Sequence, residues 1–74
     1  MIKYYLTSHA IQRIKQRNIR REDIEKVLKE PDSSYPGKQG ELNLVKKFAD
    51  GRKIRVVVKH GKNLAKIITA IIVN

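Results

Sequence analysis

Residues 41–59 read ELNLVKKFADGRKIRVVVK and contain two alternating, β-branched segments separated by Ala49-Asp50-Gly51. Such segments are typical of β-strands, and an Asp-Gly pair between them is typical of a hairpin turn. A two-residue loop at Asp50-Gly51 would place Phe48 on the same face as Lys53 and Arg55. A three-residue loop that includes Ala49 shifts the register by one. It gathers six apolar side chains on one face: Leu42, Leu44, Phe48, Ile54, Val56 and Val58.

The hydrophobic pattern selects the three-residue loop, because a one-residue slip turns every side chain of a strand over. Gly51 is then expected in the left-handed position of the loop. The apolar face is expected to pack on helices, and the opposite face of the hairpin is cationic. That opposite face holds Asn43, Val45, Lys47, Lys53, Arg55, Val57 and Lys59.

Two amphipathic helices are predicted before the hairpin, over residues 8–17 and 21–30. The apolar face of the first consists of Ala10, Ile11 and Ile14, and Thr7 or Ser8 serves as its N-cap. The second helix buries Ile24, Val27 and Leu28 and ends before Pro31. Arg20 stands where a small capping residue would be usual, so this helix lacks a strong side-chain cap.

Residues 64–73 are apolar on both sides, which indicates a central strand or one covered by a partner. An odd-length loop near His60 places Thr69 beside Arg55, whereas an even-length loop buries Thr69. Residues 2–6 are a candidate for a short edge strand. The predicted fold is therefore α+β in a single domain, residues 1–74, with two N-terminal helices packed on one face of a three- to four-stranded antiparallel sheet.

The charge of the chain points to a polyanionic partner. The sequence has 17 Lys and Arg against 7 Asp and Glu, a formal net charge of +10 spread along its length. Nucleic acid is the commonest ligand of such domains, although a basic composition also occurs in soluble proteins from hot habitats. There is no cysteine, only two histidines and no signal or membrane-spanning segment. We therefore expect a cytoplasmic protein with no membrane association and no metal or cofactor.

The predicted first helix carries His9, Arg13 and Arg17 in a stripe beside its apolar face. Cleavage of RNA by its own 2′-hydroxyl needs a proton acceptor, a proton donor and positive charge at the phosphorane oxygens, and no metal. Histidine can serve either proton role, and arginine matches the geometry of phosphate. The alternative is a solvated cationic flank, because basic residues four apart are common on helix surfaces.

Further candidate residues lie on the predicted sheet and its loops. Arg55 either binds phosphate or forms the polar side of a half-solvated sheet. Lys47, Lys53 and Lys59 form an electrostatic surface for nucleic acid rather than a catalytic group. Tyr35 either stacks on a base or covers the end of the core.

The chain resembles an uncharacterised family of small bacterial and archaeal domains of unknown function. The matching segments are HAIQRIKQRNI (9–19), IEKVLKEP (24–31), YPG (35–37), VKKF (45–48), GRKIRVVV (51–58) and IITAI (67–71). That family is grouped by fold with RelE-like and colicin-like RNase toxins. The resemblance implies a metal-independent RNase site made of His9, Arg13, Arg17 and Arg55, with Thr69 as a weaker member. No tyrosine or lysine matches the general acid of RelE-like toxins.

Three functions follow from these expectations. The first is a toxin-type endoribonuclease in which His9 is the acid or base, Arg13, Arg17 and Arg55 hold the phosphate, and an acidic antitoxin is the partner. The second is a non-catalytic nucleic-acid-binding module that uses the basic face. The third is an interaction domain that forms a homodimer through the apolar strand at residues 67–73.

Overall fold

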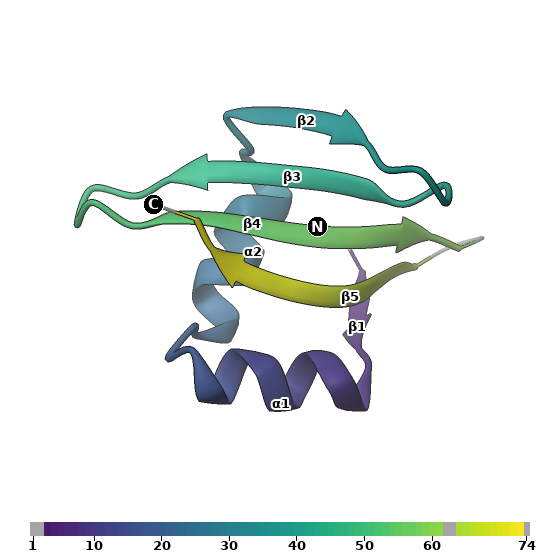
Figure 1. Cartoon of the computed structure of the whole chain (residues 1–74), viewed down its shortest axis with the longest axis horizontal. Helices are drawn as coiled ribbons and strands as arrows, with labels where there is room; N and C mark the ends of the chain where they lie inside the picture. The colour runs from purple at the N-terminus through teal and green to yellow at the C-terminus, as the bar shows by residue number, and fades with distance from the viewer. Residues whose placement is uncertain (1–2, 62–63, 74) are drawn as a thin grey trace.

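The computed structural model describes residues 3–61 and 64–73 and has an α+β fold. Its elements are β1 (Tyr4–Leu6), α1 (Ser8–Gln16), α2 (Arg21–Lys29), β2 (Ser33–Pro36), β3 (Leu42–Lys47), β4 (Lys53–His60) and β5 (Ala65–Ile72). The strands form one sheet in the order β1-β5-β4-β3-β2 (Figure 1). β1 runs parallel to β5 and the other neighbours are antiparallel, so the sheet is five-stranded and mixed. The expected three- to four-stranded antiparallel sheet was too small and lacked the parallel pair.

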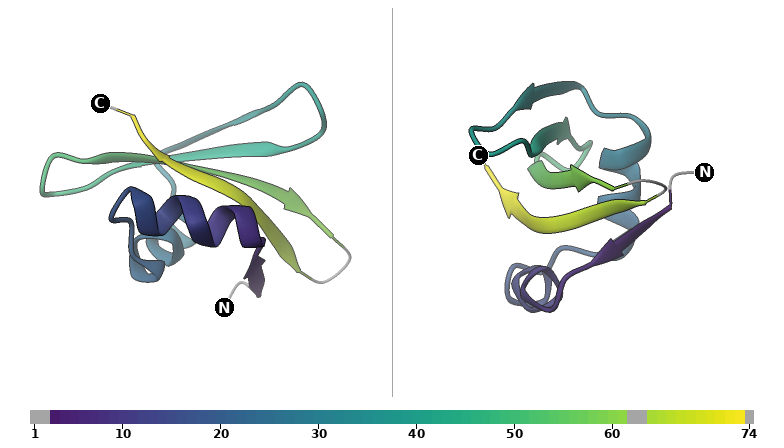
Figure 2. Two further views of the ribbon diagram at one scale, coloured as in Figure 1. Left: turned by 60° about the horizontal axis from the view of Figure 1, so that its bottom comes forward. Right: turned by 90° about the vertical axis from the view of Figure 1, so that its right-hand side faces the viewer.

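The two helices occupy different places around the sheet. α2 packs on β3 and β4 and lies behind the sheet in Figure 1. α1 runs along β5 and β1 at the lower edge of the same view. Figure 2 shows the sheet bending around α2. The expectation that both helices cover one face is therefore fulfilled by α2, whereas α1 mainly covers an edge.

The register of the β3–β4 hairpin is the one that the hydrophobic pattern predicts. Leu42 pairs with Val58 and Leu44 with Val56. The Phe48 N–H donates to the Arg52 carbonyl at 2.7 Å across the three-residue loop, and Gly51 has a φ of 94°. A residue with a Cβ is strained at this φ, which explains why glycine occupies the position.

Lys46 is a basic residue on the apolar side of the hairpin, opposite Ile54. Its Nζ donates to the backbone carbonyl of Glu30 at 2.9 Å, at the C-terminal end of α2. A lysine stem can cross apolar surface while its ammonium group reaches a polar partner. The cation also interacts favourably with the negative end of the helix dipole. Lys46 therefore joins β3 to α2 and is consistent with the predicted register.

A β-bulge in β5 decides the position of Thr69. His60 pairs with Ala65, so the connection from β4 to β5 has an even length, which on its own would bury Thr69. The register then shifts: Val58 pairs with Ile67, but Val57 pairs with Thr69. Ile68 is the extra residue. Thr69 consequently lies on the face opposite α2, although the loop length alone predicts the reverse.

β2 was not predicted from the sequence. All four residues, Ser33–Pro36, are exposed, so no burial periodicity exists in this segment. The strand is short, lies at the edge of the sheet and ends at Pro36, as is usual for a protected edge.

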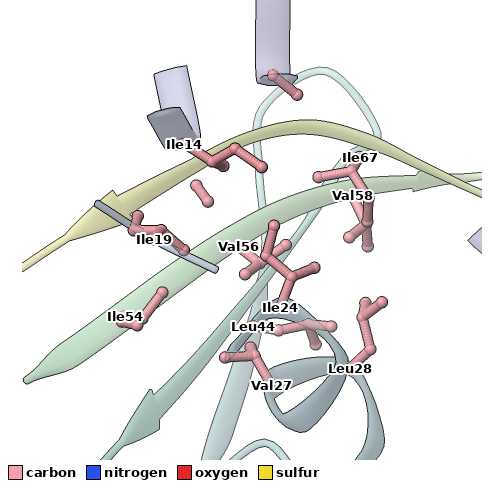
Figure 3. Close-up of a cluster of buried hydrophobic side chains, with 12 residues drawn as sticks. Ile14, Ile19, Ile24, Val27, Leu28, Leu44, Ile54, Val56, Val58 and Ile67 are labelled. Atoms are coloured by element: carbon pink, nitrogen blue, oxygen red, sulfur yellow. The ribbon is translucent and has the colours of Figure 1, made fainter. Parts of the chain in front are cut away.

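One hydrophobic core joins the helices to the sheet (Figure 3). α1 contributes Ala10 and Ile14, and Ile19 enters from the connection between the helices. α2 and the sheet supply Ile24, Val27, Leu28, Leu44, Ile54, Val56, Val58, Ile67 and Ala70. Ile11 was expected in the apolar face of α1 but is 40% exposed. It lies on the far margin of the stripe, beyond the reach of β5.

The predicted helix caps are largely confirmed. The Thr7 hydroxyl accepts a hydrogen bond from the Ala10 N–H at 3.1 Å and caps α1. Arg20 is the N-cap of α2 and makes no side-chain cap bond. The buried carboxylate of Asp23 compensates, because it accepts from the Arg20 N–H at 3.1 Å. This is half of a capping box, supplied from within the helix.

Asp23 also ties α2 to the tip of the hairpin. Arg52 donates from two guanidinium nitrogens to the two Asp23 carboxylate oxygens, at 3.0 and 3.3 Å. Arg52 further pairs with Asp50 at 2.8 Å and lies over the Phe48 ring. Burial raises the pKa of Asp23, but the hydrogen bonds from Arg52 and the Arg20 backbone outweigh it and hold the pKa below 3.8. Hydrogen bonds from the backbone and side chain of Arg52 likewise lower the pKa of Asp50.

At nine residues each, α1 and α2 are too short to span a bilayer, and the described ranges contain no other helix.

Candidate nucleic-acid interface

The face of the sheet opposite α2 carries the predicted basic surface, and we call it the open face. Strand register and the alternation of side chains define its members. They are Tyr5, Ser33, Tyr35, Asn43, Val45, Lys47, Lys53, Arg55, Val57, Lys59, Lys66, Thr69 and Ile71. Seven of these were expected on this face from the hairpin alone, and Thr69 joins them through the bulge.

None of the five strands contains an acidic residue. Three of the acidic residues belong to α2, and the others follow α2 or lie in loops: Glu22, Asp23, Glu25, Glu30, Asp32, Glu41 and Asp50. Lys59 lies directly opposite Lys66 in the register, and Lys47 lies opposite Lys53. Like charges directly across from each other destabilise a sheet. The open face therefore concentrates positive charge at some cost to stability.

Arg55 occupies the centre of the open face, between Val45 of β3 and Ile71 of β5. Its guanidinium donates to the Tyr35 hydroxyl at 3.3 Å, and this bond crosses over β3. The bridge explains why Val45 is only 7% exposed although α2 does not cover it. The Arg55 Nε is buried and has no hydrogen-bond partner among the described residues. An unpaired buried N–H costs about 1–3 kcal/mol, so Arg55 is poorly explained as a stabilising residue.

Two exposed tyrosines lie near opposite edges of the open face. Tyr35 on β2 is 45% exposed and Tyr5 on β1 is 44% exposed. Sequence reasoning singled out Tyr35 but missed Tyr5, because its side of the sheet depends on the pairing of β1 with β5. The signal available was the YY pair itself: Tyr4 donates its hydroxyl to Glu25 of α2 at 2.8 Å, so its neighbour points the other way.

His9 and Arg13 form a pair on the exposed surface of α1. The Arg13 Nε donates to the His9 Nε2 at 3.2 Å, one helical turn apart. In this arrangement the Nε2 lone pair is occupied, and the neutral ring carries its proton on Nδ1. His9 can therefore donate a proton from Nδ1, but it can accept one at Nε2 only after Arg13 moves away.

Arg17, the third member of the predicted stripe, is engaged by the sheet. Its guanidinium donates to the Ala70 carbonyl of β5 at 2.9 Å, and its side chain is half-buried. β1 pairs with β5 only at Ala65–Ile67, so Arg17 satisfies a carbonyl on the edge beyond β1. This contact gives Arg17 a structural role that its spacing along the helix did not reveal.

The structure does not bring the predicted catalytic residues together at one point. Arg55 reaches toward Tyr35 on β2, whereas α1, which carries His9 and Arg13, packs beside β5 and β1. β2 and β1 are the opposite edges of the sheet. The single groove expected for His9 and Arg55 is thus replaced by two separate groups, one on the open face and one on α1.

No cluster of three or more His, Asp or Glu side chains in the described part of the chain is placed to hold a metal ion. His60, at the end of β4, is exposed, in agreement with its expected surface position.

The fold and its surface define a class: a small basic α+β domain with an acid-free sheet face and a separate histidine–arginine pair. Within that class, the chain belongs to the family described as Domain of unknown function (DUF4258), whose model matches residues 6–72. No curated protein and no solved structure matches the chain.

Proposed function

We propose that this domain binds nucleic acid on the open face of its sheet, with RNA as the expected ligand. The observation that carries the proposal is the absence of carboxylates from all five strands beside the clustered lysines of the open face. Phosphate contacts from lysine and arginine supply most of the affinity of non-specific nucleic-acid binding. The face is also uncovered by α2, so an extended polyanion can reach it.

Arg55 supports this proposal at the centre of the face. It is half-buried, held by Tyr35, and forms no ion pair with any described residue. A guanidinium fixed in this way loses little side-chain freedom when it binds a phosphate through two donors. The lysines around it supply longer-range attraction.

The test is the binding of labelled single-stranded RNA by wild type and two double variants, measured by fluorescence anisotropy. Lys59→Gln/Lys66→Gln removes two charges from the open face, and Lys26→Gln/Lys29→Gln removes two from α2. Both variants start from the same net charge of +10, so they are matched in total charge. We expect the open-face variant to weaken binding several-fold more and to flatten the salt dependence by about 0.7 log units per lost phosphate contact. Equal effects of the two variants would contradict a localised site.

A second candidate is a metal-independent endoribonuclease of the toxin type, as the RelE-like resemblance implies, with an acidic antitoxin that covers the open face. The His9–Arg13 pair favours it, since one group can donate a proton and the other can hold a phosphate. We expect RNA cleavage that persists in EDTA and falls by roughly 10²- to 10⁴-fold in His9→Ala. Wild-type protein that leaves RNA intact would rule this candidate out and leave the binding proposal standing.

A further inference from the structure

We infer that Tyr5 and Tyr35 are two stacking platforms for unpaired bases, so that the ligand of the open face is a single strand lying across the β-strands. This inference rests on the proposed nucleic-acid binding and adds the class of ligand and its direction. Base stacking on aromatic side chains is the usual partner of backbone electrostatics in single-strand recognition.

The side of the sheet on which Tyr5 lies is fixed by its neighbours. Tyr4 and Leu6 pack against the core, and the Tyr4 hydroxyl contacts Glu25 of α2. Alternation along β1 places Tyr5 on the opposite side. In the register, Tyr5 is next to Lys66, which is next to Lys59. An exposed ring thus stands at the end of a row of two lysines.

Tyr35 ends a neighbouring row at the other edge. It pairs with Asn43, and Asn43 pairs with Val57. The bond from Arg55 to the Tyr35 hydroxyl holds the ring in one place, and the Asn43 amide donates to the Tyr35 carbonyl at 3.4 Å. A ring held in advance loses less freedom on stacking against a base. The neighbouring guanidinium is positioned for the phosphate beside that base.

The separation of the two rings sets the direction and the minimum length of the ligand. Three strands lie between β1 and β2, so the rings are separated by four strand spacings, roughly 19 Å along the sheet. Stacked bases rise by about 3.4 Å each, so several nucleotides are needed to reach both rings. The strand would cross Lys66, Lys59 and Arg55 on the way. A duplex cannot use this site, because its base faces are already stacked.

The experiment compares Tyr5→Ala, Tyr35→Ala, Tyr35→Phe and the double alanine variant in binding to an RNA of about 12 nucleotides, single-stranded or as a duplex. We expect each alanine variant to lose roughly 5- to 150-fold in affinity for the single strand, with duplex binding unchanged. Tyr35→Phe keeps the ring and is expected to retain most of the affinity. Ile11→Ala, which removes an exposed apolar side chain from α1, is the control and is expected to bind like wild type. A single-stranded DNA arm shows whether the site distinguishes the sugar.

Two results would overturn the inference without affecting the binding proposal. The first is wild-type affinity in the double tyrosine variant while Lys59→Gln/Lys66→Gln is weakened, which would leave a purely electrostatic face. The second is an equal loss in Tyr35→Phe and Tyr35→Ala, which would make Tyr35 an anchor for Arg55 rather than a platform. If neither the tyrosine nor the lysine variants change affinity, the proposed function itself fails.

Discussion

Asp23 is the residue on which most of the polar structure depends. It is one of the few acidic side chains that are buried, and it serves the N-terminus of α2 and the tip of the β3–β4 hairpin together. Because α2 and the hairpin are separate in the sequence, this carboxylate fixes their relative position. The clamp also keeps Arg52 away from the open face, so the arginine that matters for ligand binding is Arg55.

We expect Asp23→Ala to lower the free energy of unfolding by about 2 kcal/mol, since it removes a helix cap and two hydrogen bonds from a guanidinium. Urea denaturation at neutral pH measures the change. The matched control is Glu22→Ala, which removes an exposed carboxylate from the same helical turn. It is expected to cost less than about 1 kcal/mol. Equal losses would mean that only the charge near the helix N-terminus matters.

The same residue predicts a pH dependence. The pKa of Asp23 lies below its ordinary value of 3.8 in the folded state, so its contribution is present above that value. The contribution is lost as the pH falls through the lower folded pKa, and the folded state loses stability in acid. The difference in urea midpoint between wild type and Asp23→Ala should therefore shrink below about pH 4. A difference that stays constant down to pH 2 would show that the carboxylate charge is not responsible.

At the level of elements, β5 holds the molecule together and depends on one extra residue. It is the strand that pairs with both β1 and β4, and α1 packs along it. The bulge at Ile68 turns the distal half of the strand so that Ala70 and Ile72 face the core and Thr69 and Ile71 face outward. Without the bulge, the same residues would exchange faces.

Deleting Ile68 should therefore abolish cooperative folding, because Thr69 would enter the core and Ala70 would leave it. Far-UV circular dichroism during urea titration tests this, with Ile68→Ala as the control that keeps the register. The substitution is expected to cost about 1 kcal/mol or somewhat more, as is usual for truncation of a half-buried apolar side chain. A deletion variant with wild-type stability would show that the sheet can repair its register elsewhere.

The elements differ in how far their sequences predict them. The β3–β4 hairpin was predicted correctly because turn chemistry at Gly51 and the apolar alternation agree. β2 was missed because exposure on both sides removes any periodicity, and Pro36 with Gly37 suggests a loop. β1 was predicted as an edge strand, but its parallel partner lies about sixty residues away and leaves no local trace. The position of His9 relative to Arg55 depends on these long-range pairings, and so periodicity could not supply it.

For the whole molecule, the dominant feature is the separation of charge. Acidic residues gather on α2 and in loops, and the strands carry only basic ones. With a net charge of +10 on 74 residues, the folded state includes substantial self-repulsion. A surface under such repulsion gains when a polyanion binds, so the cost to stability and the proposed ligand have the same origin.

Added salt should therefore stabilise the free protein. We expect the urea midpoint to rise between low and moderate sodium chloride, since screening weakens repulsion on the open face more than it weakens the partly buried Asp23–Arg52 pair. Lys66→Gln, which removes the charge opposite Lys59, should show a smaller rise. A midpoint that falls with salt would indicate that ion pairs outweigh repulsion in this fold.

The pairing of β1 with β5 has a consequence for how the protein is made. Tyr4–Leu6 is among the first segments to leave the ribosome, yet its neighbour Ala65–Ile67 is among the last of the described strands to be synthesised. The nascent chain must hold its first strand unpaired, together with the apolar side of α1, until translation has passed Ile67. Contacts of such long sequence separation slow folding, so completion of the sheet is a late, post-synthetic event during which chaperones have access to the unfinished edge.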